Sequence, residues 1–292
     1  MRKVVICVIL LCWMMNLAMA QETSKAEKRE PVRSPYESGI LLDNQTCVIY
    51  PANTLEFLLE HRFGPMKYGM EDLFGIWAPA NIYLGLNYSI TDYLIVGAGT
   101  AKTNRLQDIH WKWDILKQSR SGSIPVFVTY YGDIAMDARN KSVFGDNYKF
   151  ADRLSYLTEI IVTRKFYDRL TLQVSGSFSH INKVPEGQDH DKIGLSFGGR
   201  FRVSPQSSII VCYDLPINTK AITENIPLPA SMPNFSIAWE IATAAHDFQI
   251  MLGTANYLNR QYNMIYNNVD WTDWSHGSPL MLGLNLTRLW SF

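Results

Sequence analysis

Apolar and polar residues alternate with a period of two through most of the sequence, and this pattern constrains the fold more than any other feature. The segment TLEFLLEHRF places Leu55 and Phe57 opposite Glu56. The closing stretch LMLGLNLTRLWSF places Leu284 opposite Asn285. Successive side chains of a β-strand point to opposite faces, so the pattern predicts strands with one apolar and one polar face. Most of the predicted strands have roughly 9 to 11 residues, the length that a tilted strand needs to cross a bilayer.

The connections between these strands alternate in length. The short connections ITD, KQSRSGS, FYDR, VSPQS and AAHD are separated by connections that are mostly longer, such as GPMKYGMEDLFGIWAPA. Transmembrane barrels have short periplasmic turns and longer outer loops, and an even strand number returns both termini to the periplasmic side. We therefore predict an all-β fold, a transmembrane antiparallel up-and-down β-barrel of about 12 strands over residues 54–292.

A soluble β-sandwich is the alternative, because its strands also alternate. Three features oppose it. The apolar parity persists in nearly every strand, and the other parity carries small, polar and charged residues rather than a second apolar core. Aromatic residues such as Tyr93, Tyr131 and Tyr213 gather near strand ends, as in the interfacial girdles of membrane barrels.

The N-terminus predicts export. MRKVVICVILLCWMMNLAMA combines a basic start, an apolar run too short to span a bilayer and an A-x-A cleavage site, so residues 1–20 are interpreted as a cleaved signal peptide. Residues 21–53 are interpreted as a periplasmic leader and an N-terminal extension whose position stays open. Only Cys47 and Cys212 follow the signal peptide, and the sequence leaves open whether they pair. The expected location is the outer membrane of a Gram-negative bacterium.

Charge and the C-terminus indicate the partners. Lys and Arg number 27, as do Asp and Glu, which argues against nucleic-acid binding. The expected partners are the lipid bilayer, the barrel-assembly machinery and other envelope proteins. Trp290 and Phe292 match the C-terminal aromatic signal that this machinery reads in outer-membrane proteins. Arg288 departs from the pattern because it falls on the apolar parity, so we expect it to snorkel to headgroups or to follow a bulge.

Several stretches resemble a family of uncharacterised Bacteroidota β-barrel proteins known as a domain of unknown function. The matching stretches include TLEFLLEHRFG, DLFGIWAPANIYLGLNYS, QSRSGSIPVFVTYYG, DRLSYLTEIIVTRKF, LTLQVSGSFSHIN, FSIAWEIATAAHDFQIMLG and LNLTRLWSF, and the resemblance covers most of the chain from about Pro31 to Phe292. It implies an outer-membrane barrel and supplies no activity and no catalytic residues.

If the apolar parity faces lipid, the polar parity lines the lumen. Unpaired charges inside a narrow barrel are costly, so we expect these side chains to pair across strands. The pairs either fill the barrel or leave a polar path for small solutes, which a barrel of this size would keep narrow. The candidate lumen-lining residues are Glu56, Glu60, Arg62, His110, Lys112, Asp114, Glu159, Lys192, Arg200, Arg202 and Glu240.

Catalysis is not expected. Three Ser-His or His-Asp neighbours occur without a nucleophile-elbow motif, namely Ser179-His180, His246-Asp247 and Ser275-His276. No spacing predicts a metal or a cofactor, and none is expected. The apolar loop DLFGIWAPA either folds inward as a constriction or packs on a partner. The favoured function is a narrow porin-like channel for small solutes, with a closed barrel acting as an envelope anchor or docking partner as the alternative. A lipid- or peptide-cleaving enzyme is the third hypothesis.

Overall fold

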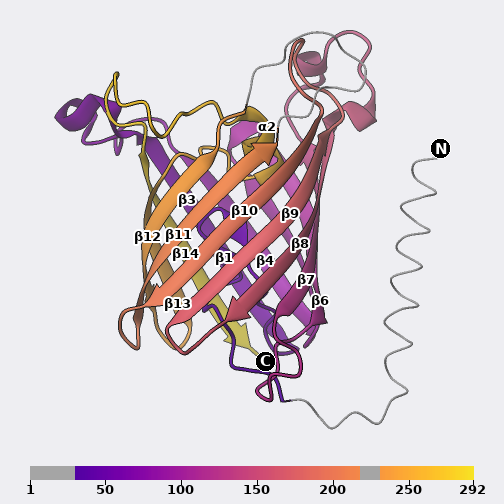
Figure 1. Cartoon of the computed structure of the whole chain (residues 1–292). Helices are drawn as coiled ribbons and strands as arrows, with labels where there is room; N and C mark the ends of the chain where they lie inside the picture. The colour runs from indigo at the N-terminus through magenta and orange to yellow at the C-terminus, as the bar shows by residue number, and fades with distance from the viewer. Residues whose placement is uncertain (1–29, 218–230) are drawn as a thin grey trace.

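Twelve antiparallel strands close into one barrel in the computed structural model, which describes residues 30–217 and 231–292 (Figure 1). Each strand pairs with its sequence neighbours, and the last pairs with the first. The prediction of a barrel of 12 strands is confirmed. The strands are β3 (Thr54–Pro65), β4 (Asn81–Thr91), β5 (Leu94–Ala101), β6 (Leu106–Leu116), β7 (Phe127–Asp137), β8 (Leu154–Lys165), β9 (Leu170–Ile181), β10 (Asp191–Arg202), β11 (Ser207–Ile217), β12 (Asn234–Ala242), β13 (His246–Gly253) and β14 (Met281–Ser291).

The signal peptide predicted for residues 1–20 lies outside the described residues, as does the leader up to residue 29. No helix within residues 30–217 and 231–292 is both long enough and apolar enough to cross a bilayer.

The apolar faces of the strands point outward and the polar faces point into the barrel. On β6, Ile109 is 65% exposed, whereas its neighbours Asp108 and His110 are each 4% exposed. On β4, Leu86 is exposed and Asn87 is buried. A soluble sandwich would bury its apolar face instead. The soluble alternative is therefore wrong, and the exposed apolar belt is the surface that contacts lipid.

The two ends of the barrel differ. Turns at residues 92–93, 166–169 and 243–245 lie at one end, here called the turn end, and it also carries the C-terminus (Figure 1). Longer connections at residues 66–80, 138–153 and 254–280 lie at the other end, the loop end. Since membrane barrels place their short turns in the periplasm, the loop end corresponds to the outer face.

The N-terminal extension, which the sequence could not place, lies inside the barrel. We call residues 36–50 the N-terminal hairpin, because β1 (Ile40–Leu41) and β2 (Asn44–Gln45) pair within it. It enters at the turn end, where Pro31 bridges Ser119 in the β6–β7 turn. Its apolar side chains pack against inward-facing residues of the wall, namely Ile95, Phe127, Ile210, Cys212, Ala238 and Met251.

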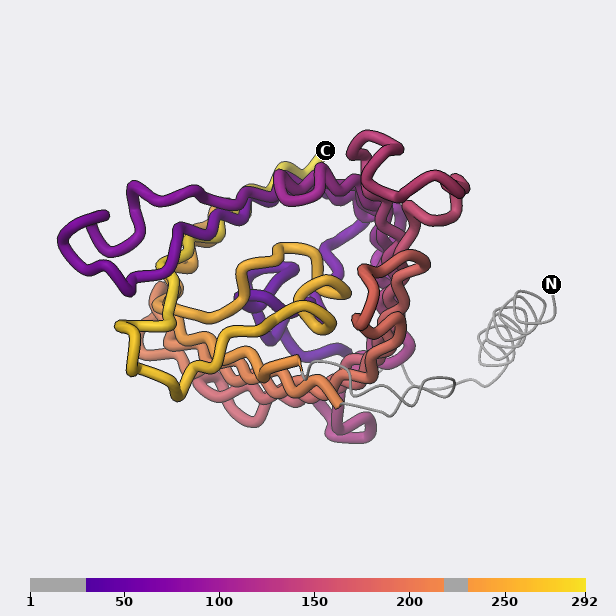
Figure 2. Tube along the Cα trace, turned by 90° about the horizontal axis from the view of Figure 1, so that it is seen from above, coloured from indigo at the N-terminus to yellow at the C-terminus, as the bar shows by residue number. Residues whose placement is uncertain are grey.

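A second segment enters from the loop end. The β13–β14 connection turns into the lumen as residues 254–267, here called the loop insert, and carries α2 (Arg260–Tyr266) (Figure 2). Six of the seven residues of α2 are buried. The β3–β4 connection, which contains DLFGIWAPA and η2 (Met66–Asp72), instead leans away from the barrel (Figure 2). Its Trp77 is 72% exposed, so the hypothesis that this loop forms an inward constriction is wrong.

Arg288 lies on the outer face of β14 near the turn end. Its Nη1 donates to a ring nitrogen of His246, the residue opposite it on β13, at 3.0 Å, and its guanidinium lies over the Trp290 ring at 5.4 Å. The β14–β3 register shifts only between Met281 and Gly283, at the opposite end of the strand. A bulge at Arg288 is therefore not the explanation. Trp290 and Phe292 are both exposed at the turn end, and their role in barrel assembly stays a prediction.

The two cysteines are free and buried rather than paired. Burial raises the pKa of the Cys47 thiol, in the N-terminal hairpin, to about 12. The thiolate is the reactive form of cysteine, so the folded protein should keep this thiol inert.

We expect a polar maleimide at mildly alkaline pH to leave Cys47 and Cys212 unlabelled in the folded barrel and to label both in urea. An Asp146→Cys variant, with its thiol on an exposed loop, is the positive control and should react in both conditions. Mass spectrometry after labelling measures the outcome. Rapid labelling of Cys47 in the folded protein would show that the hairpin does not stay inside the barrel.

Candidate functional site

The eleven candidate lumen residues all lie on inward-facing positions of the strands. Ten are buried, and Arg202, near the turn end, is partly exposed. The structure brings them together in layers along the barrel axis. Hydrogen bonds or ion pairs join six of the eleven to the two inserted segments, namely Glu56, Arg62, Lys112, Glu159, Arg200 and Arg202.

The layer near the turn end joins three strand residues to Glu37, at the start of the N-terminal hairpin. Arg200 Nε donates to Glu240 Oε2 at 2.6 Å, and both side chains are buried. Glu37 accepts from Arg200 at 3.4 Å and from Arg202 at 3.1 Å. Arg200 and Glu240 are the pair that matches the expectation of charge pairing between strands.

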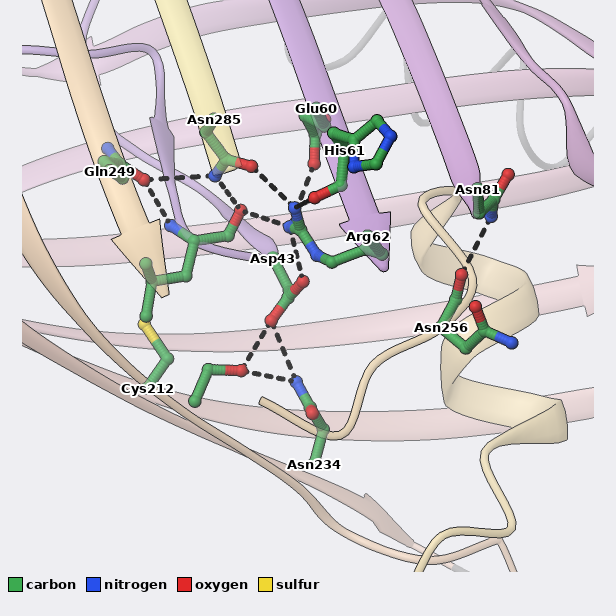
Figure 3. Close-up of polar contacts among 12 residues, drawn as sticks. Asp43, Glu60, His61, Arg62, Asn81, Cys212, Asn234, Gln249, Asn256 and Asn285 are labelled. Atoms are coloured by element: carbon green, nitrogen blue, oxygen red, sulfur yellow. Dashed lines mark hydrogen bonds and ion pairs between the residues drawn. The ribbon is translucent and has the colours of Figure 1, made fainter. Parts of the chain in front are cut away.

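The tip of the N-terminal hairpin is held by a central layer of polar side chains (Figure 3). Arg62 Nη2 donates to Asp43 Oδ1 at 2.9 Å, and its Nη1 donates to Asn285 Oδ1 at 2.7 Å. Ser236 donates to the second oxygen of Asp43 at 2.6 Å. Gln249 Oε1 accepts from the Leu42 backbone N–H at 3.0 Å. Strands β3, β12, β13 and β14 therefore bind the tip through side chains.

The lower part of the hairpin is held in the same way. Lys112 donates to the Gly39 carbonyl at 2.5 Å. Glu56 accepts from the Gly39 N–H at 3.2 Å and from the Tyr50 hydroxyl at 2.7 Å. Lys112 and Glu56, two predicted lumen residues, thus bind the backbone of the hairpin, and Glu56 also binds the Tyr50 hydroxyl. Asp114 instead accepts from Thr129 at 2.6 Å, and Lys192 pairs with Asp189 at 3.0 Å.

Arg260 is the functional residue that the sequence reasoning missed. It extends from α2, and its Nη2 donates to Glu159 at 2.9 Å and to Ser196 at 2.8 Å. Its Nη1 donates to the Asp43 carbonyl at 3.3 Å, so the loop insert and the hairpin meet here. The period-two pattern does not extend into this connection. The available signal was a lone arginine within the aromatic stretch YLNRQYNMIY.

A cavity of about 650 Å³ opens at the loop end, above the loop insert. Pockets for small ligands fall in the same range of volume. Three tyrosines form one wall, with ring centroids 5.7 to 6.2 Å apart, and Asp137 holds Arg139 through a 2.6 Å contact. The charged and aromatic residues that line it are Asp137, Arg139, Phe144, Lys183, Glu186, Tyr257, Tyr262 and Tyr266.

The residues considered for catalysis are not assembled into a triad. Ser179 points into the barrel, whereas His180 contacts Asp191 at 2.5 Å and Asn182 at 2.8 Å. His246 contacts Arg288, and Ser275 donates to Asp273.

A closed barrel with an apolar outer belt and a polar, charged lumen defines a transmembrane β-barrel protein. Residues 36–290 match the family described as a membrane bound beta barrel domain (DUF5777). The chain belongs to this family, which confirms the resemblance to a domain of unknown function. The matched region begins at the N-terminal hairpin, so the hairpin is part of the family domain.

A solved outer-membrane channel shares the fold at low sequence identity. The COG4313 outer membrane channel from Pseudomonas putida F1 aligns over 83% of this chain and 97% of its own, with a TM-score of 0.51 and 11% identity. The KdgM porin aligns over 82% of this chain and 99% of its own, with a TM-score of 0.46 and 7% identity. No curated protein matches the sequence.

The Arg200–Glu240 pair gives a test of lumen energetics. Removing one partner of a buried ion pair is strongly destabilising, and Arg200 would keep only its longer contact with Glu37 at 3.4 Å. Glu240→Ala should therefore lower the free energy of unfolding by about 3 kcal/mol, the low end for such pairs. Glu71→Ala, on the exposed β3–β4 loop, should change it by less than about 0.5 kcal/mol. Urea unfolding in lipid vesicles, followed by tryptophan fluorescence, measures both values. Equal effects of the two substitutions would show that the pair is solvated.

Proposed function

We propose that this protein is a narrow, non-enzymatic channel for small polar solutes in the outer membrane of a Gram-negative bacterium, held closed by its own inserted segments. The observation that carries the proposal is that side chains, not strand pairing, attach both segments to the wall. The β1–β2 hairpin forms a separate two-stranded sheet from the barrel. Either segment can therefore leave the lumen without opening the barrel wall.

The loop insert is the better candidate for a movable gate. The hairpin adds an apolar cluster to its polar contacts, including Leu41 and Leu42 at 0% exposure. The loop insert depends on a helix of seven residues without a side-chain cap at its start. Helices this short are marginal on their own, so α2 depends on its contacts with the wall. These contacts are the ion pair between Arg260 and Glu159 and the packing of Tyr262 and Ile265 against wall residues such as Leu106.

The cavity at the loop end supports small polar solutes as the cargo. Its wall offers both charges, from Arg139 and Glu186, and the hydroxyls of three tyrosines. A solute bound there rests against the loop insert, since Tyr262 and Tyr266 belong to α2. The cavity at the loop end therefore directly adjoins the loop insert, the proposed gate.

We expect planar-bilayer recordings of the wild type to show low conductance. Replacing residues 256–266 with a short Gly-Ser linker should raise it, and deleting residues 36–50 as well should raise it at least several-fold further. The matched control shortens the outward-leaning β3–β4 loop, which should leave wild-type conductance unchanged. A folded double variant without conductance, and without solute uptake in liposomes, would eliminate the channel.

A docking role is the second candidate, favoured by the outer loops. Large apolar side chains are exposed on the β3–β4 connection, where Met70 is 71% and Trp77 is 72% exposed. Tyr68, Phe74 and Ile76 on the same connection and Trp274 on the β13–β14 connection are also exposed. Apolar patches of this kind mark sites of contact with proteins or membranes.

If the outer loops bind another envelope protein, in-cell cross-linking from Trp77 should trap a defined partner. Met70→Ser and Trp77→Ser together should abolish the cross-link. Val143→Ser, which removes an exposed apolar side chain from a different loop, should preserve it. A barrel that remains solitary in the wild type would exclude this role.

A further inference from the structure

Three potential metal ligands meet on the inner wall formed by β6 and β7. Asp108 and His110 are two residues apart on β6 and so share its inner face, and Asp133 is the direct cross-strand partner of His110 on β7. Each side chain offers a ligand atom, and these atoms all lie within 4.8 Å of one another. All three residues are 4% exposed. The strand register alone therefore assembles one nitrogen and two carboxylate donors.

A chain of hydrogen bonds fixes which nitrogen of His110 carries a proton. Asn87 Nδ2 donates to Glu56 Oε2 at 2.7 Å, so the amide oxygen of Asn87 faces His110 Nε2, at 2.5 Å. A carbonyl oxygen only accepts, so Nε2 donates. Gly97 lies between Asn87 and His110 in the ladder, and a Cβ there would overlap both atoms. The glycine thus makes room for this contact.

The other nitrogen of His110 faces a second acceptor. Nδ1 lies 2.7 Å from Asp108 Oδ2. In the neutral ring with the proton on Nε2, a lone pair would point at a carboxylate oxygen. The lone pair on Nδ1 and the carboxylate oxygen therefore point at the same position, and a metal ion bound by both groups would satisfy them.

The surroundings of this position favour a metal ion over a single proton. Asp108 Oδ1 is buried without a hydrogen-bond partner among the described residues. Gln261 donates from Nε2 to Asp133 at 2.6 Å, and its buried Oε1 likewise has no hydrogen-bond partner among the described residues. A cavity of about 30 Å³ adjoins the three ligands, which is enough for an ion and a water molecule. Four carboxylates line this cavity, from Asp43, Glu60, Asp108 and Asp133. Asp43 and Glu60 contact Arg62, whereas no described arginine or lysine forms an ion pair with Asp108 or Asp133.

We propose that Asp108, His110 and Asp133 bind a divalent transition-metal ion of the Zn²⁺ type, through Nδ1 of the histidine and one oxygen of each carboxylate. A mixed nitrogen and oxygen donor set with open positions suits zinc, whereas Mg²⁺ and Ca²⁺ prefer oxygen donors alone. Asn87 is a positioning residue, because it fixes the tautomer of the ligating histidine. All three ligands belong to the barrel wall, so the assignment of the site does not rest on the proposed channel, although Gln261 of the loop insert contacts Asp133.

The test uses the full mature chain refolded in detergent, with ZnCl₂ as the probe in isothermal titration near neutral pH. We expect one Zn²⁺ per barrel, and Co²⁺ in its place should give the visible absorption of mixed nitrogen and oxygen coordination. Asp133→Asn, which keeps the side-chain shape, should abolish binding, and Asn87→Ala should weaken it by about 10- to 100-fold. His180→Ala removes the histidine of the outer His180–Asp191 pair and should bind as the wild type does.

Heat-modifiable mobility on gels verifies that each variant is folded before titration. His110→Ala should also lose the ion, and the Asp133→Asn result decides the question if His110→Ala does not fold. A folded wild type that binds no Zn²⁺ would overturn the proposal. Stoichiometric binding that survives Asp133→Asn would place the ion elsewhere and equally refute the assignment.

Discussion

Backbone hydrogen bonding in an apolar solvent is the constraint on which the rest of this structure depends. In hydrocarbon each unpaired N–H or C=O is costly, so a sheet that crosses a bilayer must close on itself. Here β14 closes the ring against β3, and no sheet edge is left within the barrel. Closure then dictates side-chain placement, because one parity of every strand faces lipid and the other faces the axis. The charged parity must therefore find its partners inside.

Several of those partners come from the two inserted segments of the same chain. Arg62 and Glu159 pair with Asp43 and Arg260, which belong to segments that enter the barrel from opposite ends. The two inserts fill the lumen by different means. The N-terminal hairpin combines an apolar cluster with polar contacts at its tip, whereas the loop insert presents a short helix that combines the Arg260 ion pair with a second apolar cluster around Tyr262 and Ile265. Both segments pair with charged residues of the wall, so the stability of the barrel depends on whether the segments occupy the lumen.

The periodicity of the sequence predicted the wall of the barrel and the inward placement of its charges, because period two is a property of each strand alone. Glu56 and Lys112 could be assigned to the lumen from their neighbours, but their partners in the hairpin could not. Residues 36–50 and 254–267 lack regular periodicity, and their positions follow from long-range contacts that no local pattern encodes. Asp133 illustrates a third case, since only the register of β6 and β7 reveals that it faces His110.

The position of the hairpin also constrains the order of events during biogenesis. It immediately precedes β3, and the seam that seals the cylinder joins β3 to the final strand. The barrel can therefore close only after β14 has been delivered to the membrane. Residues 36–50 precede β3 in the chain, so they are already available to be enclosed at that point. Wrapping the nascent sheet around residues 36–50 would avoid threading them through a finished aperture. The hairpin would then serve as an internal template. Its backbone and Asp43 would supply the hydrogen-bond and ion-pair partners of Glu56, Arg62 and Gln249 while the barrel forms.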